Sequence, residues 1–172
     1  MKRIVICADG TWNRPEEDLS KDHPTNVLRL ARGVCPVASD DMEQVVFYDW
    51  GVGTDRKRLT GGAFGEGLNK NGQDCYRFLV QNYSPGDQLF LFGFSRGSYT
   101  VRSLAGFIFN SGILRRTHAR RIVQAYELYK NPDEHPEETF SLTFRQKYSH
   151  TDSQTIAFIG VWDTVGALGI PF

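Results

Sequence analysis

The sequence predicts an α/β fold in which a mainly parallel β-sheet is wrapped by helices, in a three-layer αβα arrangement. Short β-rich apolar runs recur along the chain, at residues 3–8, 43–48, 89–92 and 155–162. Helical spacing of apolar residues separates the first three runs, and such strand–helix alternation is typical of parallel sheets with right-handed crossovers. With 40% hydrophobic residues in 172, the chain is long enough for a core of its own, so we expect a single domain over 1–172.

The first predicted strand, Arg3–Ala8, is apolar without internal alternation, as expected of a central strand that is covered on both faces. A polar stretch with the sequence Asp-Gly-Thr-Trp-Asn follows at residues 9–13. The carboxyl end of a parallel strand is where such folds place binding groups. A helix is then predicted over residues 25–33, with Thr25 or Asn26 as its N-cap.

The second predicted strand, Glu43–Tyr48, opens into a loop over residues 49–67 that is dense in glycine. A helix is expected from about Glu66 to Tyr83, and a turn at residues 84–87 leads into the third strand. The glycines at 61–67 lack the Gly-Lys-Ser/Thr ending of a P-loop and form no dinucleotide-binding fingerprint. We therefore interpret them as part of a surface loop.

The third strand runs into Gly93-Phe94-Ser95-Arg96-Gly97, and a helix is predicted from there to Phe109. A Gly-x-Ser-x-Gly sequence between a strand and a helix is typical of a nucleophile elbow, in which the serine occupies a sharp, strained turn. The glycines remove Cβ atoms that would collide across this turn. The helix N-terminus favours an oxyanion beside the serine, with the Arg96 N–H as the first donor. A glycine-bounded turn with an inert Ser95 is the alternative interpretation.

Residues 113–152 are charged and aromatic with partly helical spacing, and we interpret them as a helical cap inserted over the site. Solvated surface decoration is the alternative. A further buried strand, at residues 155–162, ends at Asp163. In hydrolases with a nucleophile elbow, the acid of the triad follows a later strand than the serine does, so Asp163 is the candidate acid. The alternative for Asp163 is a carboxylate that caps the turn after this strand.

Charge and cysteine content exclude several classes of partner. Lysine plus arginine equals aspartate plus glutamate at 20 each, so no global field attracts nucleic acid, and we expect no nucleic-acid partner. The three cysteines match no metal-ligand spacing and are interpreted as reduced thiols, so we expect no metal and no cofactor. No stretch has the form of a signal peptide or a membrane span, which favours a cytoplasmic location, while export without a cleaved signal stays open.

Four blocks of sequence resemble a known family, the α/β-hydrolase-like domain of unknown function that includes phospholipase effectors of the type VI secretion system. The blocks are ADGTWN at 8–13, YDWGVGT at 48–54, GFSRG at 93–97 and GVWDTVG at 160–166. Together they span essentially the whole chain. The resemblance implies a serine esterase or lipase with Ser95 as the nucleophile and Asp163 as the acid that orients a histidine. It also implies an ester or lipid substrate, which includes phospholipids, and transient contact with a membrane surface.

The histidines depart from the family pattern, in which the catalytic histidine lies well downstream of the Trp-Asp-Thr-Val block. In this chain His23, His118, His135 and His150 all precede Asp163, and His150 is the nearest in sequence to the acid strand. We therefore expect this chain to be the N-terminal part of a hydrolase domain that is incomplete at its C-terminal side. A missing segment or a partner chain would complete the fold and supply the base. A non-catalytic hydrolase-like binding or assembly module is the alternative function.

With a base supplied, a histidine would take the Ser95 proton, Ser95 would attack an ester carbonyl, and water would hydrolyse the acyl-enzyme. The second oxyanion donor is expected in the loop after the first strand, as a backbone N–H of Gly10 or Thr11. Asp9 is expected to support that loop by bonding to its amides, with an ordinary Asx-turn as the alternative. The loop is also similar to the phosphatase loop of haloacid dehalogenases, but Cys7 stands where those enzymes carry their nucleophilic aspartate, so we discount that activity.

Overall fold

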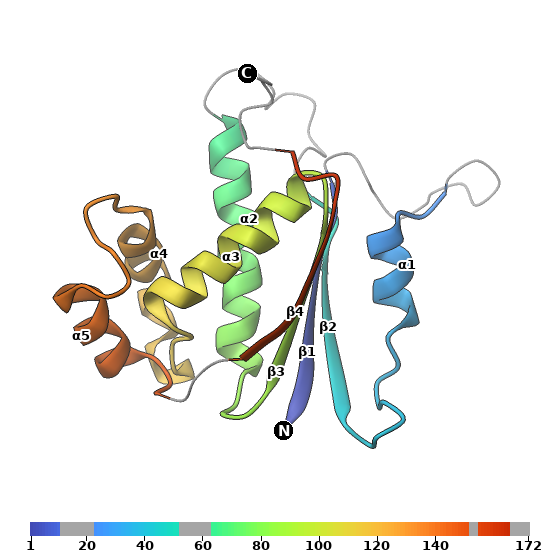
Figure 1. Cartoon of the computed structure of the whole chain (residues 1–172), viewed down its shortest axis with the longest axis horizontal. Coiled ribbons are helices and arrows are strands. Elements are labelled where there is room, and N and C mark those ends of the chain that lie inside the picture. Colours follow the sequence, from blue (N-terminus) through green and yellow to red (C-terminus); the bar gives the residue numbers. More distant parts are fainter. Residues whose placement is uncertain (11–22, 52–62, 152–154, 166–172) are drawn as a thin grey trace.

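A four-stranded parallel sheet forms the middle of the molecule, in the order β2-β1-β3-β4 (Figure 1). The strands are β1 (Lys2–Ala8), β2 (Glu43–Asp49), β3 (Gln88–Phe94) and β4 (Thr155–Trp162). This computed structural model describes residues 1–10, 23–51, 63–151 and 155–165, with the backbone alone for 63–69 and 155. Each strand pairs in parallel with its neighbours, which confirms the parallel sheet predicted from the sequence.

Helices cover both faces of the sheet and complete three layers (Figure 1). On one face lies α1 (Asn26–Gly33), and on the other lie α2 (Ala63–Asn82) and α3 (Arg96–Ser111). Because successive strand residues point to opposite faces, β1 supplies both cores. Val5 and Cys7 pack on the α1 side, whereas Ile4 and Ile6 pack on the side of α2 and α3. The predicted αβα fold is confirmed.

The start of α1 agrees with the sequence prediction, whereas the start of α2 does not. Thr25 is the N-cap of α1, because its side chain accepts a hydrogen bond from the Leu28 N–H at 3.0 Å. By contrast, α2 begins at Ala63, inside the predicted glycine-rich loop over 49–67, so the C-terminal part of that loop prediction was wrong. The low helix propensity of glycine is a weak preference, which the rest of a 20-residue helix overrides here. Residues 52–62 of the predicted loop lie outside the described residues.

The segment over residues 113–152 is helical and is closed at its base by strand-like pairing. It contains the 3₁₀ helix η2 (Arg116–Arg121), α4 (Ile122–Lys130) and α5 (Thr139–Tyr148). Leu114 and Ser149 form an antiparallel bridge, and the His150 N–H donates to the Ile113 carbonyl at 2.9 Å. The helices pack against α2 and α3, and they lie beside the C-terminal half of α3 (Figure 1). A role as a cap over bound substrate stays a prediction.

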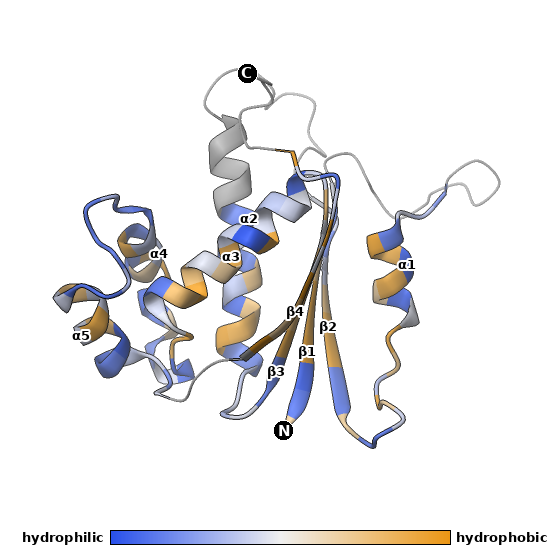
Figure 2. Cartoon of the chain, in the orientation of Figure 1, coloured by the Kyte–Doolittle hydropathy of each residue, from blue (hydrophilic) through white to orange (hydrophobic). Residues whose placement is uncertain are grey.

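Side-chain burial is greatest in the middle of the sheet. In β1, the central strand, Ile4 to Ala8 are almost fully buried, while the amino ends of β1 and β2 are hydrophilic (Figure 2). At this amino edge the buried carboxylate of Asp87 accepts the Lys2 backbone N–H at 2.8 Å and the Ser84 N–H at 2.9 Å. Asp87 thereby ties the start of β1 to the turn that precedes β3.

Strand β4 forms one edge of the sheet and exposes apolar side chains on both of its faces. Phe158, Ile159 and Val161 are 51%, 41% and 38% exposed. Because neighbouring strand residues alternate in direction, Phe158 and Ile159 point to opposite faces. An exposed apolar edge strand offers unpaired backbone groups and uncovered surface to further polypeptide.

Candidate active site

The turn between β3 and α3 has a strained backbone at Ser95, which adopts φ 54° and ψ −117°. Side-chain-bearing residues rarely occupy this region. A Cβ on Gly93 would stand 2.5 Å from the Gly97 carbonyl oxygen, and a Cβ on Gly97 would stand 2.0 Å from the Ala8 carbonyl oxygen. Both positions therefore require glycine, which is the local condition for a sharp strand-to-helix turn with the serine at its apex.

Asp163 follows β4 as Ser95 follows β3, so both residues lie at the carboxyl edge of the sheet. Phe94 pairs with Trp162, and the Ser95 N–H donates to the Trp162 carbonyl at 2.9 Å. The Val165 N–H in turn donates to the Ser95 carbonyl at 3.3 Å. Asp163 is exposed and adopts a left-handed conformation with φ 47°. The structure thus brings the predicted nucleophile and the predicted acid side by side.

Ser98 is a buried residue beneath this turn that the sequence analysis did not identify. Its Oγ lies 2.7 Å from the Gly93 carbonyl oxygen and 2.8 Å from the Trp162 carbonyl oxygen. It therefore connects the first turn of α3 to the ends of both β3 and β4. Its sequence signal is a hydroxyl in the first turn of a helix, a position where serine commonly bonds to nearby backbone.

Asp9, at the end of β1, is a buried carboxylate on which three neighbouring segments converge. Its Oδ1 accepts the Gly10 N–H at 2.8 Å, and its Oδ2 accepts the Tyr48 hydroxyl at 2.8 Å. The Thr25 hydroxyl, which also caps α1, donates to the same Oδ2. Burial, followed by the hydrogen bond to Asp9, raises the pKa of Tyr48 far above its usual value, so the phenol remains a donor. The carboxylate thereby fixes the loop after β1 to α1 and β2.

The expected second oxyanion donors lie in this same loop. The Gly10 N–H is already directed at the Asp9 carboxylate, so in this conformation it does not point toward an oxyanion at Ser95. Thr11 lies outside the described residues. The Asp9–Gly10 bond itself is the contact expected of a carboxylate that braces its own loop.

The end of β2 packs against the same loop and adds a second carboxylate. A Cβ on Gly51, which has φ +79°, would stand 2.5 Å from the Gly10 carbonyl oxygen. The Asp9 N–H donates to the Asp49 carbonyl at 2.8 Å, and the Asp49 Oδ1 accepts the Gly51 N–H at 3.2 Å. Burial raises the pKa of the Asp49 carboxyl above its usual value. The ends of β1 and β2 therefore form one closely packed unit beside the Ser95 turn.

The N-terminus of α3 adds a favourable electrostatic environment at Ser95. Arg96 is the first residue of this 16-residue helix, and its N–H belongs to the first turn, where amides have no carbonyl earlier in the helix to bond. The helix dipole places partial positive charge at this end. Burial lowers the pKa of the Arg96 guanidinium from its ordinary value, but arginine remains charged. An anion that develops at Ser95 would thus be stabilised.

Three of the four histidines belong to the 113–152 segment, and their neighbours place them away from Ser95. The ring of His150 packs against Tyr83, just before the amino end of β3, with 5.3 Å between ring centroids. Ser95 lies beyond the opposite end of this seven-residue strand, about 20 Å away. His118 packs against Tyr148 in the same segment, and His135 lies between α4 and α5. Within the ranges that the structure describes, no histidine contacts Ser95 or Asp163.

The cysteines and acidic residues were also considered as a nucleophile and as metal ligands among the described residues. Cys7 and Cys75 are buried, Cys35 is exposed, and all three are free thiols. Burial, with a smaller contribution from Asp9, raises the pKa of Cys7 to about 12, which makes it a poor nucleophile. Among the described residues, no cluster of three or more histidine, cysteine and acidic side chains is arranged to hold a metal ion.

Comparison with known proteins shows the family of the chain. A model of the catalytic domain of Tle1-like phospholipase effectors of the type VI secretion system matches residues 2–172. The chain belongs to this family. A relative of this chain, the uncharacterized protein YEL023C of Saccharomyces cerevisiae, is 30% identical to it over 192 residues, which cover 98% of this chain and 27% of the relative. The chain thus spans about a quarter of the length of that relative. No solved structure matches the present chain.

The matched model describes a catalytic domain, and its hydrolase-like α/β fold agrees with the parallel sheet that the structure shows. In the described part of the chain, no helix combines the length and the apolar character needed to cross a bilayer.

Proposed function

We propose that this chain carries the nucleophile and the acid of a serine esterase that cleaves carboxylic ester bonds of phospholipids. The observation that carries the proposal is the strained turn at Ser95, with Asp163 at the end of the neighbouring strand. Backbone strain of this kind costs on the order of 1–3 kcal/mol and is characteristic of functional sites. Membership of a phospholipase family favours phospholipid over other esters.

The reaction would proceed through an acyl-enzyme. A histidine removes the proton from the Ser95 hydroxyl as the Oγ forms a bond to the ester carbonyl carbon, and the carbonyl oxygen becomes an oxyanion. The Arg96 N–H and the α3 dipole stabilise that oxyanion, and Thr11 becomes the expected source of the second N–H because the Gly10 N–H bonds to Asp9. Collapse of the intermediate breaks the ester C–O bond, and the alcohol leaves with the proton from histidine. Water then hydrolyses the acyl-enzyme, with histidine again as base and Asp163 holding its tautomer.

The histidine would come from polypeptide that packs along β4. This strand has unpaired edge groups and exposed apolar residues on both faces, at Phe158, Ile159 and Val161. A further segment of the complete polypeptide, or a partner chain, would cover this surface and could place a histidine beside Asp163. The relative from yeast, of which this chain covers 27%, has ample length for such a segment. Action on phospholipid would also require transient contact with a membrane surface.

The experiment that tests the proposal is fatty-acid release from phospholipid vesicles by the complete polypeptide that contains this chain. Ser95→Ala and Asp163→Asn should each lower the rate by at least 100-fold, on the order of the losses seen when members of serine triads are removed. Ser84→Ala and Asp133→Asn are matched controls at exposed positions and should retain full activity. Full activity of Ser95→Ala would overturn the proposal.

One observation favours a second function, that of a non-catalytic binding or assembly module. Within the described ranges, no histidine approaches Ser95, and a serine without a base is a weak nucleophile. A complete polypeptide that folds and binds phospholipid vesicles, but releases no fatty acid and does not react at Ser95, would support this module over the esterase.

A further inference from the structure

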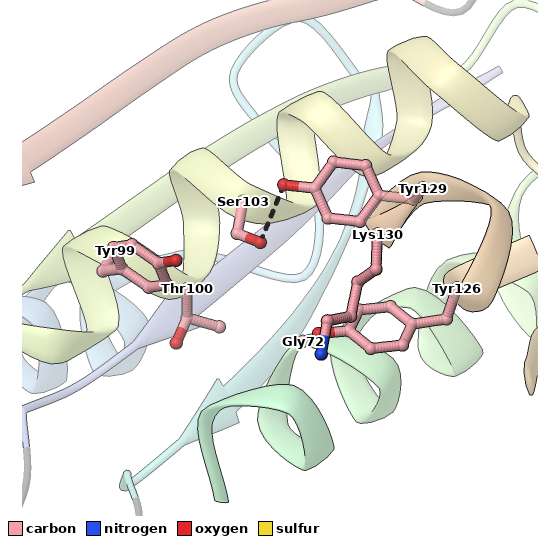
Figure 3. Close-up of a pocket in the computed structure, with 7 residues that line it drawn as sticks. All are labelled: Gly72, Tyr99, Thr100, Ser103, Tyr126, Tyr129 and Lys130. Atoms are coloured by element: carbon pink, nitrogen blue, oxygen red, sulfur yellow. Dashed lines mark hydrogen bonds between the residues drawn. The ribbon is translucent and has the colours of Figure 1, made fainter. Parts of the chain in front are cut away.

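A pocket of about 240 Å³ lies between α2, α3 and α4 (Figure 3), and Ser95 is not one of the residues that line it. Tyr99, Thr100 and Ser103 of α3 line one side, and Tyr126, Tyr129 and Lys130 of α4 line the other. The α3 residues that line it, Tyr99 to Ser103, follow Ser95 by four to eight residues, which corresponds to about 6–12 Å along a helix. The pocket is somewhat smaller than typical ligand sites, which span about 300–1,000 Å³. Its lining combines aromatic rings with hydroxyl groups and one cation.

The α2 side of the pocket is lined by Gly72, a residue without a side chain. Gly72 lies within α2 and is buried, yet a Cβ at this position would meet no atom within 4 Å. Glycine inside a helix is less stable than alanine by about 0.5–1 kcal/mol. Packing therefore does not require glycine here, although helix stability disfavours it. Its effect is to leave the pocket open toward α2.

The wall formed by α4 is held in place before any ligand binds. The Tyr129 hydroxyl lies 3.1 Å from the Ser103 Oγ, as the dashed line in Figure 3 shows. The Tyr129 ring stacks on Phe107 with centroids 5.5 Å apart. It also lies close to the α3 backbone at Gly106, where a Cβ would stand 3.2 Å from the ring. Burial raises the pKa of Tyr126 to about 12, so this phenol stays protonated at neutral pH. The wall thus presents fixed, neutral hydroxyl groups.

Lys130 brings positive charge to these hydroxyl groups. Its Nζ lies 5.8 Å from the centroid of the Tyr126 ring, and it forms no ion pair with any residue in the described part of the chain. Lys70 on α2 differs, because Asp74 neutralises it at 2.9 Å. An ammonium beside several hydroxyl groups suits an anion that also carries hydroxyl groups of its own.

We propose that this pocket binds the phosphate and hydroxyl groups of a phosphorylated polyol of the glycerol phosphate type. Lys130 contacts the phosphate, and the serine, threonine and tyrosine hydroxyls bond to the polyol. Such a group occurs both as a free metabolite and as the headgroup of a glycerophospholipid. The proposal does not depend on ester hydrolysis at Ser95.

Calorimetric titration of the chain with glycerol 3-phosphate tests the site. We expect saturable binding that weakens at least 10-fold in Lys130→Gln and is lost in Gly72→Met, whose side chain fills the pocket. Lys70→Gln is the matched control on the facing helix and should bind as the parent does. Binding that survives both Lys130→Gln and Gly72→Met, or no saturable binding by the parent chain, would overturn the proposal.

Gly72→Ala separates a ligand role from a structural one. Alanine should raise the melting temperature, because it favours the helix and meets no neighbour, while it lowers the affinity for glycerol 3-phosphate. A lower melting temperature for this variant would show that Gly72 serves packing and would contradict the argument.

Flotation with vesicles distinguishes the two sources of the ligand. Vesicles of phosphatidylglycerol that retain the parent chain, release it upon addition of glycerol 3-phosphate and fail to retain Lys130→Gln would identify the ligand as a lipid headgroup. Calorimetric binding without such retention would identify a free phosphorylated polyol. Both outcomes support the site, whereas the absence of saturable calorimetric binding overturns it.

Discussion

The Gly97 backbone lies so close to the carbonyl of Ala8 that a Cβ on Gly97 would stand 2.0 Å from the Ala8 oxygen. This contact joins the first turn of α3 directly to the end of β1. The strained Ser95 and the loop that begins with Asp9 are therefore parts of one rigid unit. A change in either element should disturb the other.

Gly97→Ala should lower the free energy of unfolding by about 3 kcal/mol or more, because the new methyl group would overlap backbone atoms that cannot move independently. Urea denaturation followed by circular dichroism measures the loss. Gly33→Ala is the matched control, since a Cβ there meets nothing within 4 Å, and it should be neutral or slightly stabilising. Equal stabilities of the two variants would contradict the close contact.

Ser95→Gly should be more stable than Ser95→Ala by about 1 kcal/mol, because glycine adopts φ 54° and ψ −117° without the cost that a Cβ imposes. Ordinary positions show the reverse order, since glycine loses more entropy on folding. Thermal denaturation of the two variants gives the comparison. Ser84, which has no positive φ, should follow the ordinary order, and the same order at Ser95 would argue against strain.

Asp9→Ala should destabilise the protein by about 3 kcal/mol, because it leaves the Tyr48 hydroxyl, the Thr25 hydroxyl and the Gly10 N–H without their acceptor. Asp9→Asn retains acceptor capacity and should cost less. Chemical denaturation measures both. The exposed Asp133 is the control, and Asp133→Ala should change stability by less than about 0.5 kcal/mol. A small effect of Asp9→Ala would mean that the loop is held by other contacts.

Asp49→Asn should stabilise the protein at pH 7, with a gain that disappears as the pH falls toward about 4. Burial raises the folded-state pKa of Asp49 above the unfolded value of about 3.9, so the folded state binds this proton more tightly. The favourable contribution of Asp49 is fully present below the unfolded pKa and is lost as pH rises through the folded pKa. Asparagine keeps the acceptor for the Gly51 N–H and carries no charge.

Denaturation of the parent and Asp49→Asn at matched pH values isolates this titration, because all other groups are common to both proteins. A variant that is less stable than the parent at pH 7 and equally stable at pH 4 would reverse the predicted sign. It would indicate that the charged form of Asp49 is the one that the fold stabilises.

The fold was predictable because strands and helices leave strong local patterns. The predicted bounds of β1 and β2 agree with the structure to within one residue, and Ser95 and Asp163 lie at one edge because the carboxyl ends of parallel strands share it. The helix was predicted to begin at about Glu66, whereas α2 begins at Ala63. The glycines of this stretch favour a loop, but later residues of the helix outweigh that weak preference.

Contacts between residues far apart in the chain could not be predicted from the sequence. Thr25 and Tyr48 lie 16 and 39 positions from Asp9, and neither carries a signal that it donates to this carboxylate. The diversion of the Gly10 N–H depends on the rotamer of Asp9, which a sequence does not specify. The open space beside Gly72 likewise arises only when α2, α3 and α4 pack together.

Covalent labelling with a fluorophosphonate probe shows whether Ser95 is an activated nucleophile. We predict that the complete polypeptide gains the mass of one adduct, that peptide mapping places it on Ser95, and that Ser95→Ala abolishes it. The 172-residue chain alone should label far more slowly, because no histidine in its described part approaches Ser95. A complete polypeptide that hydrolyses phospholipid yet carries no adduct, or carries it on another residue, would contradict the assignment.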